Sequence, residues 1–186
     1  MTSRRIYIEC QLSQGSFSGE VVFEVETIGE GTYVGVAPRR DCFMPDGQPF
    51  EFIDATFQVK VSGKDTEGRC AIFDTIRHKK VGPHLHIHTN CDEWFLVKEG
   101  EFKFQVGEKI LRLKAGDSLL VPREMPHAFV KTSEGDAKLM IMHQPAVGMD
   151  EYFRLAAKQP DQSAEARIKF AEQFGMRFVG NDLKPD

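Results

Sequence analysis

Three histidines and one glutamate in the middle of the chain have the spacing of a metal-binding site. His86 and His88 end a run that begins at Gly82. Alternate residues of a β-strand point to the same face, so the two imidazoles can meet one metal ion. Glu93 opens the next apolar stretch, and a turn between the two segments can direct its carboxylate back toward the histidines. His127 follows a strand bounded by glycine and proline and can supply a fourth donor.

Three imidazoles and one carboxylate suit one divalent first-row transition metal, which would be Fe, Mn, Ni, Cu, Co or Zn. His84 shares the parity of His86 and His88 and could be a further donor. Three alternate strand residues span about 13 Å, however, so we expect His84 at the strand's entry, where it would line the mouth of the pocket. His78 and His143 lack ligand spacing, and we expect ordinary structural roles for both.

Residues 54–146 contain many short apolar or alternating runs that predict β-strands. The expected strands cover residues 56–61, 69–76, 84–88, 93–98, 102–106, 109–113, 118–121, 127–131 and 138–142. Such close spacing without intervening helices indicates a mainly β fold, an antiparallel barrel or jelly roll. Phe95 and Val97 share the parity of Glu93, so we expect them to face the barrel interior, and Trp94 and Leu96 to face outward.

The regions on either side of the barrel have different patterns. Residues 1–53 contain short alternating runs separated by glycine turns, which predict a small β extension. After Gly148 the pattern becomes helical, because acidic residues begin one segment and Pro160 ends it. We therefore expect a C-terminal helical extension over residues 147–186.

The candidate ligands resemble two motifs of the cupin superfamily. Residues 82–100 fit the first motif, H-x-H-x4-E-x6-G, at every spacing, with the donors named above and Gly100 in place. Residues 116–127 resemble the second motif, G-x5-P-x-G-x2-H-x3-N. In that motif Glu124 replaces a glycine and Lys131 replaces the final asparagine.

Within that superfamily, residues 83–88, 122–129 and 145–154 are most similar to the quercetinase-like branch (cupin 2 conserved barrel), although His84 stands where that branch often has proline. The resemblance covers roughly residues 54–158. It implies a double-stranded β-helix, or jelly-roll, cupin barrel with small N-terminal and C-terminal additions. The ligand set that it implies is His86, His88, Glu93 and His127.

The resemblance also implies an activity. In the quercetinase-like branch a dioxygenase acts on an enolic or phenolic small molecule, and Glu93 would then be the catalytic base that accepts the substrate's proton. Two other classes stay open, because the cupin fold hosts many functions. One is a non-catalytic, metal-dependent small-molecule binding module, and the other is a metal-dependent isomerase or lyase.

Composition and sequence pattern limit the possible binding partners and the expected cellular location. The net charge of -4 provides no basic surface for nucleic acid, and no apolar run reaches membrane length. The N-terminus lacks a signal-peptide layout, so we expect a cytoplasmic protein. The four cysteines are scattered, without a C-x-x-C pair, and should be reduced thiols; they are Cys10, Cys42, Cys70 and Cys91. Because Trp94 and Leu96 should form an exposed apolar face, we also expect a homodimer.

Overall fold

The structure describes residues 3–8, 21–27, 33–35, 47–161 and 163–185 of the 186-residue chain. In this computed structural model the chain forms two compact units, Met1–Phe43 and Met44–Asp186. The first unit contains an antiparallel sheet with the strand order β1-β2-β3, in agreement with the expected β extension. Its strands are β1 (Ser3–Ile8), β2 (Val21–Thr27) and β3 (Tyr33–Gly35). Cys10 and Cys42 lie outside the described residues.

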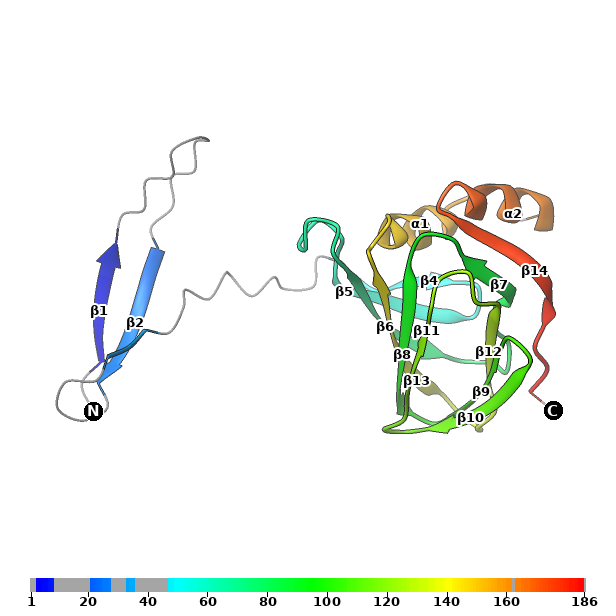
Figure 1. Cartoon of the computed structure of the whole chain (residues 1–186), viewed down its shortest axis with the longest axis horizontal. Helices are drawn as coiled ribbons and strands as arrows, with labels where there is room; N and C mark the ends of the chain where they lie inside the picture. Colours follow the sequence, from blue (N-terminus) through cyan, green and yellow to red (C-terminus); the bar gives the residue numbers. More distant parts are fainter. Residues whose placement is uncertain (1–2, 9–20, 28–32, 36–46, 162, 186) are drawn as a thin grey trace. The chain divides into compact units, whose positions relative to one another are not determined.

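The second unit is a jelly-roll barrel made from two antiparallel sheets, which confirms the predicted fold class (Figure 1). The strand order is β10-β9-β12-β7-β14 in one sheet and β11-β8-β13-β6-β5-β4 in the other. The first sheet consists of β7 (His84–His88), β9 (Glu101–Val106), β10 (Lys109–Lys114), β12 (His127–Lys131) and β14 (Met176–Asp182). The second consists of β4 (Phe50–Phe52), β5 (Ala55–Val61), β6 (Ala71–Arg77), β8 (Asp92–Glu99), β11 (Ser118–Val121) and β13 (Ala137–Gln144).

Strict alternation of side chains gives the barrel its interior. On β5, β6, β8 and β13, buried residues alternate with half-buried ones over most of each strand. On β8, Phe95 and Val97 are fully buried on the same face as Glu93, whereas Trp94 and Leu96 are only half-buried. The parity that the sequence predicted for this strand is confirmed. Burial of the apolar face therefore fixes which way the functional side chains point.

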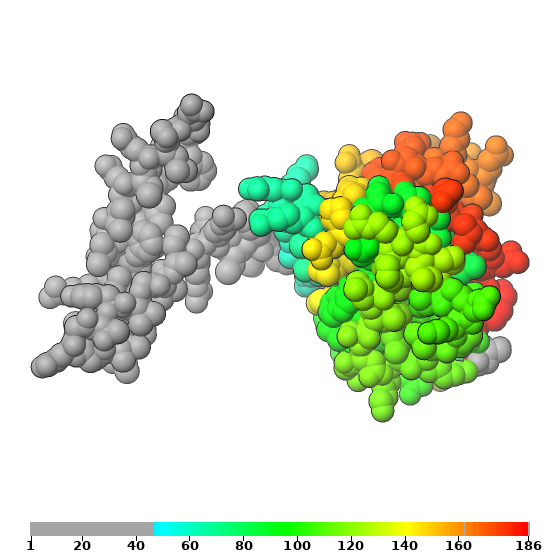
Figure 2. Space-filling view, in the orientation of Figure 1, coloured from blue at the N-terminus to red at the C-terminus, as the bar shows by residue number. Residues whose placement is uncertain are grey.

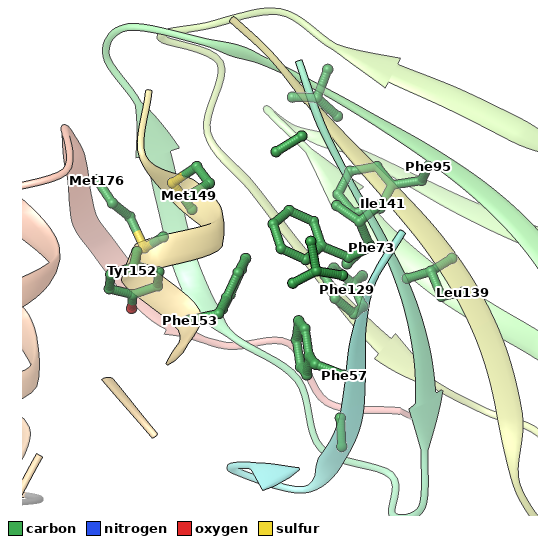
Figure 3. Close-up of a cluster of buried hydrophobic side chains, with 14 of the residues drawn as sticks. Phe57, Phe73, Phe95, Phe129, Leu139, Ile141, Met149, Tyr152, Phe153 and Met176 are labelled. Carbon is green, nitrogen blue, oxygen red and sulfur yellow. The ribbon is translucent and has the colours of Figure 1, made fainter. Parts of the chain in front are cut away.

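Two helices follow the barrel and cover one end of it (Figure 1). They are α1 (Met149–Ala156) and α2 (Ala164–Glu172). Phe153 of α1 packs against Phe57 and Phe73, with ring centroids 4.7 Å and 5.1 Å away, and Figure 3 shows these rings converging in the core. Tyr152 stacks on Phe170 of α2 at 5.8 Å. In the described part of the chain, no helix has both the length and the apolar character needed to cross a membrane.

Two strands fall where the sequence did not predict them. Residues 147–186, expected to form a helical extension, also contain β14, which pairs with β7 and runs beside the helices along one side of the second unit (Figure 2). β4 lies within the expected N-terminal extension but belongs to the barrel, because Phe50 and Phe52 form a hairpin with β5. β14 is mostly exposed and lacks the alternation of a half-buried strand. Pairing with β7, rather than its own sequence pattern, makes β14 a strand.

The turn from α2 into β14 depends on Gly175. This residue has a φ of 77°, and a Cβ there would lie 2.6 Å from the Cγ atom of Asn90. Its carbonyl accepts hydrogen bonds from the backbone nitrogen and the hydroxyl of Thr89, at 2.8 Å and 3.1 Å. The close approach holds the start of β14 against the end of β7.

We predict that Gly175→Ala lowers the free energy of unfolding by about 1–3 kcal/mol, because left-handed strain and the clash with Asn90 add together. Urea denaturation followed by circular dichroism measures the loss. Gly135→Ala is the matched control, since Gly135 also has a positive φ of 66° but a Cβ there meets nothing within 4 Å. Equal losses in the two variants would show that the contact with Asn90 contributes nothing.

Candidate metal centre

β7 brings two histidines to the barrel interior. His86 and His88 are 4% and 2% exposed, and their ring centroids lie 5.1 Å apart. His86 Nδ1 donates a hydrogen bond to the carbonyl oxygen of His84 at 2.8 Å, which leaves Nε2 as its free donor atom. The His84 ring is more than half exposed and pairs with Asp182 of β14 at 2.5 Å. The backbone of His84, rather than its imidazole, therefore orients His86.

β12 and β8 bring the other two donors to the same place. His127 is the direct cross-strand partner of His86, and their ring centroids are 4.3 Å apart. His127 Nδ1 donates to the carbonyl of Met125 at 2.9 Å, so its Nε2 points inward. Glu93 Oε2 lies 2.7 Å from His127 Nε2 and 3.1 Å from His88 Nε2. One carboxylate oxygen thus meets two of the three imidazoles.

The four side chains form a buried cluster of compact dimensions. One ligand atom from each of His86, His88, Glu93 and His127 lies within 4.8 Å of all the others. Donors about 2.1 Å from a single ion are at most about 4.2 Å apart, so a contraction of less than 1 Å would bring all four to one centre. Borderline imidazole nitrogen and carboxylate oxygen suit a divalent first-row metal. The cluster is therefore compatible with such an ion.

The electrostatics of the cluster favour the protonation states that a cation needs. Burial, followed by the proximity of His127 and His88, holds the pKa of His86 well below its ordinary value, and burial also lowers the pKa of His88. Burial opposes ionisation of Glu93, but the attraction of His143 and hydrogen bonds from the surrounding histidines outweigh it and hold the pKa of Glu93 well below its usual range. Neutral imidazoles beside an ionised carboxylate are the forms that bind metal.

His127 differs from the other two ligand histidines. Burial would lower the pKa of its imidazole, but the hydrogen bond and the charge of Glu93 outweigh burial and raise it. Glu93 Oε2 and His127 Nε2, 2.7 Å apart, form the shortest ion-pair contact of the cluster.

Apolar rings surround the cluster on the interior side. Phe95 lies 6.2 Å from the His127 ring and packs against Phe104 and Phe129 at 5.1 Å and 5.4 Å, centroid to centroid. Phe129 is 4% exposed and faces inward, two residues beyond His127 on β12. This wall keeps the dielectric low and limits the entry of water, which strengthens interactions with charge at the cluster.

Two interior residues near the cluster were not among the predicted site residues: His143, for which we expected an ordinary structural role, and Arg77. His143 is fully buried, and its Nε2 lies 3.3 Å from Glu93 Oε1. The Arg77 guanidinium lies between the rings of Phe57 and Phe129, 5.1 Å and 5.0 Å from their centroids. Burial lowers the pKa of Arg77 to about 10, against the attraction of Glu93. Strand parity could have indicated that both residues face inward, but not what they meet.

The other residues considered in the sequence analysis either lie away from the cluster or are chemically unreactive. His78 is partly exposed and pairs with Asp136 at 3.1 Å. Cys70 and Cys91 are free thiols, and burial raises the pKa of Cys91 to about 12, which leaves it protonated. Lys131 is buried and donates to the carbonyl oxygens of His78 and Gly135. These hydrogen bonds stabilise the loop that contains Gly135. Lys131 stands at the position where the second cupin motif has asparagine.

Comparisons with known proteins agree with this geometry. Residues 74–143 match the profile of the cupin domain family. Protein SchB of Streptomyces halstedii is 24% identical over 83 residues, which cover 45% of this chain and 60% of SchB. The chain thus spans about three fifths of the length of that curated relative.

Some solved structures are similar to the barrel of this chain. A predicted oxalate decarboxylase from Thermotoga maritima has a TM-score of 0.50 and 16% identity, over 53% of this chain and 92% of that one. KdgF from Halomonas sp. has a TM-score of 0.48 and 16% identity, over 53% of this chain and 86% of that one. The matched region, 74–143, contains Glu93 and the three histidines of the cluster. Residues 74–143 of the barrel therefore form a cupin domain.

Proposed function

We propose that His86, His88, Glu93 and His127 hold one divalent transition-metal ion and that the barrel uses it to oxygenate a small enolic or phenolic molecule. One observation carries the proposal: donor atoms from three strands, all buried, lie within 4.8 Å of one another. Three imidazoles and one carboxylate gathered in this way are a ligand set that suits a divalent first-row metal. The resemblance to the quercetinase-like branch supports the type of reaction.

The side chains around the site would have different roles in the reaction. When bound, the ion would act as a Lewis acid that increases the acidity of the substrate's hydroxyl and would retain open coordination positions. Glu93 is ionised and buried, so its carboxylate would accept the hydroxyl proton. Phe95 and Phe129 would pack against the apolar part of the substrate and exclude water. Dioxygen would be the oxidant that cleaves the activated ring.

A non-catalytic binding module is the second candidate. The rings of Phe95, Phe104 and Phe129 contact one another beside the cluster. Such apolar surroundings would also suit a bound ligand that does not react. Oxygen consumption by the metal-loaded protein with a panel of enolic substrates separates the two candidates. An isomerase or lyase would act on its substrate without consuming oxygen.

The outer face of the second sheet supports a homodimer. Leu120, Trp94, Met142 and Ile72 are consecutive cross-strand partners on β11, β8, β13 and β6, and they form an apolar row. Leu120 is 58% exposed. A second copy of the chain would bury this row against the same row of its partner. The cytoplasmic location expected from the sequence is part of this proposal, and microscopy of a tagged full chain would check it.

The ligand assignment predicts that His86→Ala loses bound metal, because it removes one of the four donors. His84→Ala should keep metal content largely intact, since the His84 carbonyl oxygen that orients His86 remains. Elemental analysis of the purified variants measures both. Equal metal content in wild type and His86→Ala would contradict the assignment.

The base role predicts that Glu93→Gln keeps much of the metal but loses oxygen uptake on an enolic substrate by about 10²- to 10⁴-fold, because glutamine retains an oxygen donor without basicity. An oxygen electrode measures uptake, and elemental analysis confirms loading. Full activity in Glu93→Gln would exclude the base role. A metal-loaded wild type that consumes no oxygen with any enolic substrate would favour the binding module.

The dimer predicts that Leu120→Asp shifts the protein to monomer, because it places a charge in the apolar row. Size-exclusion chromatography with light scattering at micromolar concentration measures the mass. Ile110→Asp is the control, since Ile110 is 51% exposed on β10, the edge strand of the other sheet. A monomeric wild type would contradict the dimer.

A further inference from the structure

His143 lies beside the cluster without being part of the predicted ligand set. It is on β13, where it is the direct cross-strand partner of Glu93 on β8. Its side chain is fully buried, with ring centroids of Phe73 and Phe153 at 5.8 Å and 6.1 Å. On its other side lies His88, at 5.1 Å. The imidazole therefore sits between an apolar wall and the carboxylate of Glu93.

The environment of His143 does not satisfy its two ring nitrogens. Nε2 lies 3.3 Å from Glu93 Oε1, within ion-pair range but without hydrogen-bond alignment. Neither Nδ1 nor Nε2 has a hydrogen-bond partner within the described residues. A buried polar ring without partners is costly, and an apolar side chain would fill this space without that penalty. Packing alone therefore does not account for a histidine at this position.

The two oxygens of Glu93 have different surroundings. Oε2 faces His127 and His88, whereas Oε1 faces His143. His143 is outside the group whose donor atoms lie within 4.8 Å of one another. This separation makes His143 a neighbour of one ligand rather than a donor at the common centre. The 3.3 Å between Oε1 and His143 Nε2 is a separation that a hydrogen bond can span.

We infer that His143 is a positioning residue, whose Nε2–H donates to Glu93 Oε1 and holds Oε2 toward the three ligand imidazoles. The inference rests on the proposed metal site. A carboxylate on a long side chain has free torsions, and a partner on its outer oxygen fixes which oxygen faces the ion. Phe153 and Phe73 pack against the imidazole of His143. Because Phe153 belongs to α1, this helix is linked to Glu93 through the side chains of Phe153 and His143.

The test is Co²⁺ binding by the full chain, measured by competition with a chelator and by the visible absorption spectrum of bound Co²⁺. We expect His143→Phe, which fills the space without a donor, to weaken Co²⁺ binding by about 10- to 100-fold and to change the spectrum. His143→Gln keeps an N–H donor and should restore most of the affinity. If His143→Phe does not fold, His143→Met provides a second variant without a donor.

Ile141→Ala controls for lost packing, because Ile141 is a buried residue on the same face of β13. It should lower thermal stability and leave Co²⁺ affinity near that of wild type. Wild-type affinity and spectrum in His143→Phe, or an equal loss in Ile141→Ala, would overturn the positioning role. X-ray absorption showing four imidazoles on Co²⁺ would overturn it too, by making His143 a ligand. A wild type that binds no Co²⁺ would instead overturn the proposed function, and this inference with it.

Discussion

The register of antiparallel strand pairing is the constraint on which the site depends. β12 is aligned on β7 so that His127 opposes His86, and β13 is aligned on β8 so that His143 opposes Glu93. A slip of one residue in either pair would turn every side chain of that strand to the other face. The same parity buries Phe95 beside Glu93. Formation of the apolar core and assembly of the donors are therefore a single structural event.

That coupling explains how the barrel tolerates so many buried polar groups in one place. Separate surface histidines would cost little, but a fully buried carboxylate needs compensation from its neighbours. His88, His127 and His143 surround Glu93 and stabilise its charge. The imidazoles in turn keep unpaired nitrogens, including Nδ1 of His88 and both nitrogens of His143. The cluster is therefore compatible with a cation, and aromatic rings pack around it.

Much of the site could be predicted from local pattern, because the donors sit on strands with clear alternation. The spacing of His86 and His88, and the parity of Glu93 with Phe95 and Val97, depend only on the geometry of one strand. The contact between Glu93 and His143 depends on the alignment of two strands fifty residues apart in sequence. Nothing within either segment encodes that alignment, so His143 looked like an ordinary core residue.

The sequence did not predict β4 and β14 for the same reason, because their formation depends on pairing with another strand. β4 and β14 are edge strands whose side chains, apart from the buried Met176, are half-buried or exposed, so the alternation that marks a half-buried strand is weak or absent. β4 is identified by pairing of Phe50 with Phe57, and β14 by pairing with β7. Long-range pairing of this kind becomes visible only when the partner strand is in place.

Pairing between β14 and β7 also has a consequence for the order in which the site can form. β7 carries His86 and His88, but one of its edges has no partner until Met176 and the residues after it are available. During synthesis from the N-terminus, the histidine-bearing strand is therefore an open sheet edge while most of the barrel already exists. Contacts so distant along the chain are slow to form, because a long loop must close first. The wall of the site is therefore complete only once β14 has paired with β7.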